Sequence, residues 1–479
     1  MTTVEFVPPP PRKGFLDRAL SIFADVRAGE GVSALLLASN VFYLLAFYSV
    51  LKIVRDALIL SEAGAVAASY ASAGQAVLML AFVPAYGAFA SRVNRVWLIC
   101  GVTLFFASNL LIFALLGLAG VRLGIAFYLW IGVFNMAAVA QFWAFANDLY
   151  STERGKRLFP LVGIGASLGA VVGSGITSIV FGGVGPYRLM LLAAAGLLVP
   201  VGLTVWVHRR EKGADLARRG GPSERTAQPA LAGRVASRPD PGAGGTAAPA
   251  AQVDRPLPGP GGFQLVATDR YLRLIAVLVL VFSLVNTLGG FILNSLITAE
   301  AASRVASGAA GGLDQRALIG TMAGQIQTSV NLLAFLLQAF VVSRIFKYMG
   351  VRAALFILPL IALGGYAMMA ILPVFGIVRW VKILENSTDY SIQNTTRHAL
   401  FLPTSREAKY KAKQAIDSFF VRAGDMLQAV VVFVGTMLAF GVRSYALVNV
   451  ALVAVWLVLA VAIAREHKKL TPDVTEKAA

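Results

Sequence analysis

The chain has 479 residues, of which 57% are hydrophobic and only 14% are charged, and its formal net charge is +18 at pH 7. Because soluble domains carry about 25% charged residues, this composition excludes an ordinary water-soluble protein. The Lys and Arg residues form short runs between apolar stretches, which indicates membrane topology and argues against nucleic-acid binding. With the single cysteine Cys100 and scattered histidines, we expect no disulfide, metal or cofactor.

The chain alternates between polar segments and apolar stretches long enough to cross a bilayer. Residues 15–26 come first and alternate apolar and charged groups at helical spacing, which predicts a short helix on the membrane surface. Stretches of about 20 apolar residues then follow, the length that crosses roughly 30 Å of hydrocarbon. We expect twelve spans, near 32–55, 66–90, 96–119, 123–147, 159–182, 187–207, 271–297, 318–343, 353–373, 375–397, 414–440 and 443–464.

Basic residues alternate between the connections of these spans. Runs of Arg and Lys lie near 92–95, 154–157, 344–352 and 406–411, and both termini are basic, whereas the other connections carry few cations. Since Lys and Arg stay on the cytoplasmic side, both termini are predicted to be cytoplasmic in a multi-pass protein of the cell (inner) membrane.

A long polar segment divides the chain nearly in half. Residues 213–262 are rich in Pro, Gly, Ala and Arg, so they cannot bury enough apolar surface to fold and are predicted to be a flexible linker. The expected organisation is an N-terminal segment with an interfacial helix (1–31), a six-helix half (32–207), a cytoplasmic linker (208–270), a second six-helix half (271–464) and a cytoplasmic tail (465–479).

Short motifs repeat between the two halves. Ser91-Arg92 follows the second span, and Ser343-Arg344 follows the eighth, 252 residues later. A second set of anchors after the fourth and tenth spans repeats at 254 residues. We therefore predict an all-α membrane protein of twelve transmembrane helices in two related six-helix halves. This is the architecture of the major facilitator superfamily, in which substrate binds between the halves near the midplane.

The tenth predicted span carries a stripe of polar residues. A charged residue facing lipid costs about 2.5–3.5 kcal/mol near the helix centre, so this face is expected to line a wet cavity. The alternative is an internal salt-bridge ladder that only stabilises the bundle. At 100° per residue the stripe occupies one arc, formed by Arg379, Lys382, Asn386, Asp389, Tyr390, Gln393 and Arg397, with Glu385 beside it.

Other spans contribute further candidates for the same cavity. For the cations of the first span, the alternative is that they snorkel to the lipid headgroups. The candidates are Lys52, Arg55 and Asp56 on the first span, Gln327, Asn331 and Gln338 on the eighth, and Lys413, Asp417 and Gln428 on the eleventh. On the fifth span, Gly165, Gly169 and Gly173 form a small-residue ridge, which predicts close approach of a neighbouring helix.

Several segments are similar to one known family. The runs VRAGE at 26–30, LKIVRDAL at 51–58, FWAFAN at 142–147 and KYKAKQAID at 409–417 resemble corresponding segments of the bacterial and plastid-type ATP/ADP translocases. The resemblance implies a major-facilitator-like fold that exchanges nucleotides across a membrane.

The same resemblance carries specific residues into the candidate site. It implies that Lys52 and Lys413 contact phosphates and that Asp417 orients Lys413. Asn147, which ends the matched FWAFAN segment, is included with them.

We expect a secondary transporter working by alternating access, exchanging nucleotides (ATP/ADP-like) or another phosphorylated anionic metabolite. No Gly-x-x-x-x-Gly-Lys-Ser/Thr motif is present, so transport is not expected to be driven by ATP hydrolysis. An enzyme is not expected, since no paired acids or histidines are grouped as catalysis would need. The alternative is a proton-coupled symporter or exporter in which Glu385 or Asp389 is protonated. The expected partners are a small anionic substrate and the lipid bilayer, and the expected state is a monomer.

Overall fold

The structure is a computed structural model that describes residues 13–21, 24–90, 95–150, 152–219 and 261–471. Within these ranges every regular element is a helix, which confirms the predicted all-α class. Glycines at positive φ form tight turns between helices, as at Gly64 (φ 79°) and Gly185 (φ 78°), where a Cβ would be strained.

The N-terminal half consists of long, mostly apolar helices. Because the sixth predicted span is broken at Leu197, two consecutive helices, α7 and α8, cover it. The helices are α1 (Phe15–Leu20), α2 (Gly31–Glu62), α3 (Gly64–Ala90), α4 (Arg95–Leu118), α5 (Gly124–Leu149), α6 (Thr152–Val184), α7 (Pro186–Gly196) and α8 (Leu198–Arg219).

The C-terminal half is similar, but several of its helices contain π-helical turns. Aspartates cap two of its long helices, since Asp269 and Asp314 accept hydrogen bonds from the first-turn amides of α10 and α11. Its elements are α9 (Gly262–Thr268), α10 (Arg270–Ala306), α11 (Gln315–Leu336), η2 (Leu337–Val341), α12 (Val342–Tyr348), α13 (Gly350–Ile371), α14 (Phe375–Thr388), η3 (Asp389–Gln393), α15 (Asn394–Leu400), η4 (Ala408–Ala412), α16 (Lys413–Ala415), η5 (Ile416–Phe420), α17 (Val421–Met437) and α18 (Val442–Leu470).

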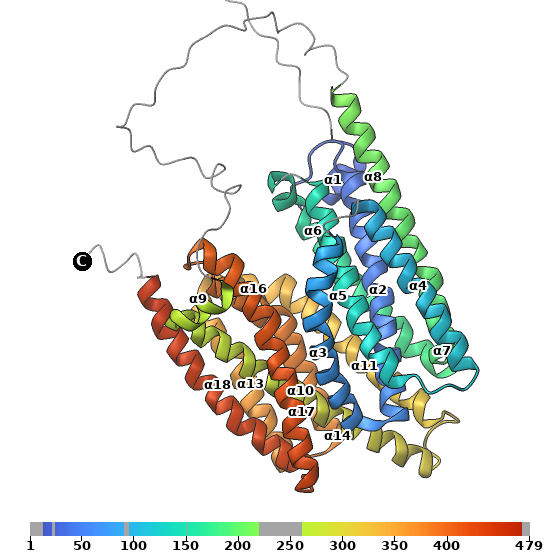
Figure 1. The fold of residues 1–479 in the computed structure, drawn as a ribbon, viewed down its shortest axis with the longest axis vertical. Helices are drawn as coiled ribbons and strands as arrows, with labels where there is room; N and C mark the ends of the chain where they lie inside the picture. The colour runs from blue at the N-terminus through green and yellow to red at the C-terminus, as the bar shows by residue number, and fades with distance from the viewer. Residues whose placement is uncertain (1–12, 22–23, 91–94, 151, 220–260, 472–479) are drawn as a thin grey trace, which may run out of the picture.

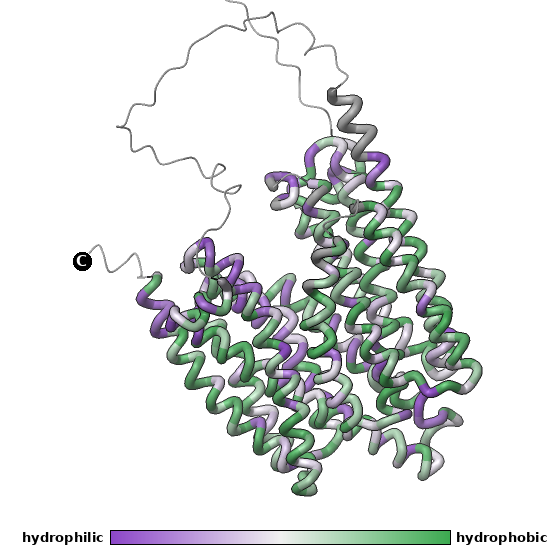
Figure 2. The backbone as a smooth tube through the Cα atoms, in the orientation of Figure 1, coloured by the Kyte–Doolittle hydropathy of each residue, from purple (hydrophilic) through white to green (hydrophobic). Residues whose placement is uncertain are grey.

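In the described part of the chain, eleven helices are long and apolar enough to cross a membrane. The tenth predicted span is not among them, although α14, η3 and α15 continue one another from Phe375 to Leu400 and are together long enough to cross. Its charged residues lower its mean hydropathy. Figure 2 shows hydrophobic helix bodies with hydrophilic residues at their ends and between the halves. The multi-pass architecture is thus confirmed, and the remaining span is the one with the polar stripe.

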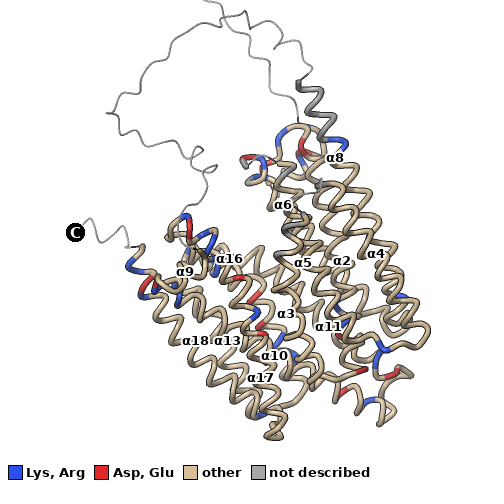
Figure 3. The backbone as a smooth tube through the Cα atoms, in the orientation of Figure 1, with Lys and Arg blue, Asp and Glu red and all other residues tan. Residues whose placement is uncertain are grey.

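The two halves lie side by side (Figure 1). They meet mainly where α11 packs on α6 and α2, and where α3 packs on α17 and α10. They diverge toward the end where α1, α9 and the last turns of α8 and α18 lie, which we call the linker end. Lys and Arg residues gather at this end in both halves (Figure 3). The linker end is therefore the one predicted to be cytoplasmic.

The predicted glycine ridge packs against α2. An added Cβ on Gly165, Gly169 or Gly173 would collide with backbone carbonyl oxygens of α2. The close approach predicted from small residues is confirmed, and it holds the first and fifth spans of this half together.

The segment 15–26 differs from a continuous surface helix, because α1 ends at Leu20. Asp17 is buried and accepts backbone hydrogen bonds from Gly29 (3.0 Å), Gly14 (3.0 Å) and Gly31 (2.9 Å). These bonds, with that from Gly29 foremost, lower the pKa of the Asp17 carboxyl. Asp17 thereby satisfies the amide of the first residue of α2 and ties α1 to it. The position of α1 on a membrane surface stays a prediction.

Candidate substrate site

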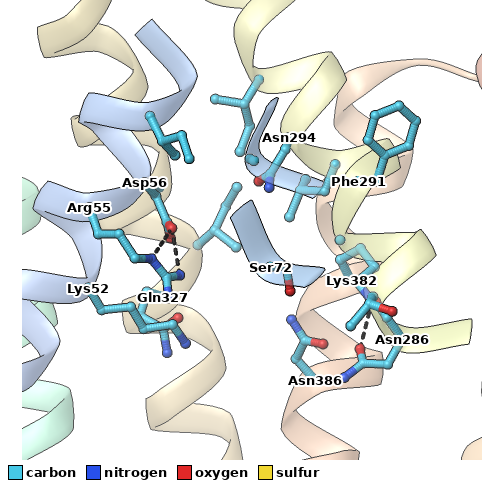
Figure 4. Close-up of a pocket in the computed structure, with 18 of the residues that line it drawn as sticks. Lys52, Arg55, Asp56, Ser72, Asn286, Phe291, Asn294, Gln327, Lys382 and Asn386 are labelled. Carbon is cyan, nitrogen blue, oxygen red and sulfur yellow. Dashed lines mark hydrogen bonds and ion pairs between the residues drawn. The ribbon is translucent and has the colours of Figure 1, made fainter. Parts of the chain in front are cut away.

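A polar cavity of about 240 Å³ lies between the halves. Its walls come from α2, α3 and α5 of the N-terminal half and from α10, α11, α14 and α17 of the C-terminal half. Figure 4 shows Lys52 and Arg55 on one side of it and Lys382 and Asn386 on the other. We call it the charged cavity, and its charged and amide side chains are Lys52, Arg55, Asp56, Asn286, Asn294, Gln327, Lys382, Asn386 and Gln428.

The two cations of α2 are in different states. The Nε and Nη2 atoms of Arg55 both donate to Oδ1 of Asp56, at 2.8 and 2.6 Å, and the guanidinium lies over the Tyr128 ring at 4.7 Å. Lys52 has no carboxylate partner among the described residues. Its Nζ lies 3.5 Å from the hydroxyl of Tyr390 and 5.8 Å from the centre of that ring. Lys52 is thus available for an anion, whereas Arg55 is already paired.

On the opposite wall Lys382 belongs to a buried network. Its Nζ lies 2.9 Å from Oε2 of Glu385 and 3.1 Å from Oδ1 of Asn286. Tyr366 donates to the Glu385 carboxylate, at 2.9 Å from Oε2. A Cβ on Gly289 would collide with the Tyr366 hydroxyl, so a glycine makes room for the network. Because both charges are paired and hydrogen-bonded, they are tolerated at this depth.

The polar stripe of the tenth span fits both interpretations of the sequence in part, cavity lining and an internal salt-bridge ladder. Lys382, Asn386 and Tyr390 line the charged cavity, as cavity lining requires. Lys382 also forms a buried pair with Glu385, as the internal salt-bridge ladder requires. Arg379, whose guanidinium lies 5.9 Å from the Trp380 ring, does not line it. The two alternatives coexist on one helix.

The other predicted residues fall at three places. Gln327 lines the charged cavity, and its amide donates to Oδ1 of Asn331 at 2.9 Å. Lys413 pairs with Asp417 at 2.6 Å toward the linker end and does not line the cavity. Asn147 is exposed near the end of α5. Lys413, Asp417 and Asn147 thus lie outside the charged cavity, and their roles in substrate binding stay predictions.

Residues of α10 and α3 complete the cavity but were not among the sequence candidates. Asn286 and Asn294 project from α10, and Ser69 accepts a hydrogen bond from Gln428 at 3.0 Å. The two asparagines lie eight residues apart in a run whose other residues are apolar or small hydroxyl residues, which is a signal that could have marked this face of α10. The serines of α3 give no such signal, because small polar residues are common in membrane helices.

A second chamber of about 560 Å³ adjoins the charged cavity toward the linker end. On α2, its lining residue Leu45 comes before the residues that line the charged cavity. On α11, its lining residue Asn331 comes after them, and Tyr390 lines both spaces. None of the described side chains that line it is charged. We call it the amide chamber, and its polar side chains are Ser167, Asn331, Gln338, Tyr390, Asn394 and Thr395.

At the end opposite the linker end, one arginine joins the halves. Arg316 of α11 lies 3.5 Å from Oε1 of Glu62 and donates to the hydroxyls of Ser61 (3.1 Å) and Tyr187 (3.2 Å). Glu62 also accepts the amide of Gly124 at 2.7 Å. We call Arg316 and its three side-chain partners the far-end latch.

A polar cavity between two packed helical halves defines the class, a multi-pass membrane protein with the major facilitator fold. The chain is similar to the crystal structure of the nucleoside transporter NupG (TM-score 0.58, 13% identity, 90% of this chain and 98% of that one). It also resembles a POT family transporter in complex with 5-aminolevulinic acid (0.57, 13%, 96% and 99%). A bacterial homologue of the human lysosomal transporter Spinster, inward-facing and unoccupied, is similar as well (0.54, 15%, 92% and 97%).

Within that class, residues 339–467 match the family model described as TLC ATP/ADP transporter. This confirms the resemblance to ATP/ADP translocases over this part of the C-terminal half, and it supports a transporter function. The similar segments of the N-terminal half lie outside the matched range. No curated protein is similar to the chain in sequence.

Proposed function

We propose that the protein is a secondary transporter that works by alternating access and carries an anionic, phosphorylated metabolite, with nucleotides as the first substrates to test. The observation that supports this most is Lys52, a cation between the halves without a carboxylate partner in the described chain. A lone ammonium at this depth is costly unless water or an anion reaches it. A phosphate group offers several acceptor oxygens to such a donor.

The arrangement of the halves supports alternating access. The charged cavity lies between them, the far-end latch joins them on one side, and they diverge on the other. Movement of one half against the other would expose such a site to either side in turn. The small-residue contact of α6 on α2 keeps the N-terminal half together during such a movement.

The test is exchange in proteoliposomes loaded with ADP and supplied with labelled ATP, and with a panel of other phosphorylated metabolites. We expect uptake by the unaltered protein and its loss, by at least about tenfold, in Lys52→Gln, because a charge-assisted contact to phosphate disappears. Lys347→Gln, an exposed lysine of α12 outside both chambers, is the matched control. Absence of uptake for every phosphorylated compound would refute the proposal.

A second candidate is proton-coupled transport, which the buried network of Lys382, Glu385 and Tyr366 favours. Glu385 is 2% exposed and reaches the charged cavity only through Lys382. A substrate anion that competes for Lys382 would leave Glu385 to take up a proton. Uptake would then depend on an inward proton gradient and fail in Glu385→Gln. Exchange that ignores the proton gradient would exclude this candidate.

A further inference from the structure

We propose that the substrate spans both chambers, with a phosphate group at Lys52 in the charged cavity and a neutral, hydrogen-bonding group, such as a base or sugar, in the amide chamber. This inference rests on the proposed function and defines the substrate class further: a phosphate ester whose other part is uncharged and polar. It also assigns a direction, with the neutral part toward the linker end.

The sizes of the two spaces favour their joint use by one ligand. Sites for small molecules usually have about 300–1,000 Å³. The charged cavity, at about 240 Å³, falls below that range and suits one charged group. The amide chamber, at about 560 Å³, lies within it and adjoins the cavity at Tyr390. A ligand of ordinary size therefore needs more space than the charged cavity offers, and the amide chamber is the adjoining space.

The chemistry of the amide chamber selects a neutral group. Its amides and hydroxyls offer both donors and acceptors, and no cation there would attract a second phosphate. Asn331 is already committed, since its amide donates to Ala170 O at 3.0 Å and its Oδ1 accepts from Gln327. Within the described part of the chain, the side chain of Gln338 has only a 3.5 Å contact from the Thr395 hydroxyl. Gln338 and the exposed Asn394 are thus the groups available to pair with a ligand, as primary amides do with base edges.

Tyr390 lines both spaces. Its hydroxyl approaches Lys52, the residue is 46% exposed, and it lies on the π-helical turn η3. An exposed aromatic ring beside a bound phosphate is a platform on which a ring-shaped neutral group can stack. Lys52, Tyr390 and Gln338 would then contact successive parts of one ligand.

The experiment measures binding of labelled AMP to the purified full chain, and its displacement by unlabelled AMP, inorganic phosphate and adenosine. We expect AMP to displace best, because only AMP occupies both chambers. Gln338→Leu and Asn394→Leu should each weaken AMP binding by about tenfold, since polar groups of the ligand lose partners. Both should leave the affinity for phosphate unchanged, which also shows that the variants are folded. Gln325→Leu, an exposed amide of α11 outside both chambers, is the control.

The outcomes separate this inference from the proposed function. Lys52→Gln should weaken AMP and phosphate alike. If the two leucine variants bind AMP as the unaltered protein does while Lys52→Gln does not, the two-chamber arrangement is wrong and the anion carrier remains. If the leucine variants lose phosphate as well, the amide chamber does not discriminate and the inference also falls. If neither AMP nor phosphate binds, both proposals fail.

Discussion

Lys382 and Glu385 form a charged pair in the interior of the C-terminal half, 1% and 2% exposed. Removal of one partner leaves an unpaired charge in a medium of low dielectric constant, whereas removal of both leaves none. The pair therefore restricts what substitutions this helix tolerates, independently of any role in transport.

We expect Lys382→Met alone to lower the free energy of unfolding by about 3–5 kcal/mol, because Glu385 is left buried without its counterion, whether it stays ionised or takes up a proton. The double variant Lys382→Met, Glu385→Leu should recover most of this loss. Thermal unfolding in detergent would measure the difference. A double variant less stable than the single one would contradict the account of the pair given above.

Single residues of the candidate site were predictable where a polar or charged side chain lies within an apolar span. Lys52, Arg55, Lys382 and Gln327 are polar groups in apolar stretches, and all four line the charged cavity. The pairs of Arg55 with Asp56 and of Lys382 with Glu385 are local in sequence, and the second fits the salt-bridge alternative. That Lys52 has no carboxylate partner among the described residues was not predictable. Whether a cation is available for substrate depends on contacts that the sequence pattern does not contain.

At the level of elements, the contact of α6 with α2 depends on glycine. An added Cβ at Gly169 would collide with the backbone of α2, but at Gly163 it would meet nothing within 4 Å. We expect Gly169→Ala to lower the unfolding free energy by about 1–3 kcal/mol through overpacking. Gly163→Ala, on the same helix, is the control and should leave the melting temperature unchanged or raise it slightly, because alanine favours a helix over glycine. Equal effects of both variants would argue against a specific close approach.

The tenth span shows where helical periodicity predicts the residues that line the cavity and where it does not. The stripe was placed on one arc with 100° per residue, which holds along α14 for Lys382 and Asn386. The π-helical turn from Asp389 to Gln393 has a wider repeat, so residues after it rotate relative to the wheel. Of the first two residues of this turn, Tyr390 lines the charged cavity and Asp389 does not. A π-turn has no reliable sequence signature, so this shift could not be predicted.

For the whole molecule, the far-end latch ties the halves together on the side opposite the linker end. Arg316 reaches from α11 to Glu62, Ser61 and Tyr187, all in the other half. Its loss should favour a conformation in which the halves separate at that end, by about fivefold in population for an interaction of about 1 kcal/mol.

The measurement is the rate at which a membrane-impermeant thiol reagent, added at the far end, labels a cysteine introduced at Ser72 in a chain whose Cys100 is replaced by Ala. Ser72 lines the charged cavity. We expect faster labelling in Arg316→Ala and no change in Arg304→Ala, whose partner Glu300 lies on the same helix. Equal rates in Arg316→Ala and the parent would show that the latch does not restrict opening.

The sequence by itself determined the class of fold, the positions of the spans and the helix that carries the polar stripe, because hydrocarbon penalises polar groups so strongly that composition and periodicity are sufficient. Only the tertiary structure decided that Lys52 has no carboxylate partner among the described residues, that a charged and an uncharged space share Tyr390 as a lining residue, and which residues join the halves at the far end. These depend on contacts between helices far apart in the chain, such as Lys52 with Tyr390 and Arg316 with Glu62. Local sequence patterns indicate whether a segment faces lipid, water or protein, whereas its contacts with other segments are determined by tertiary packing.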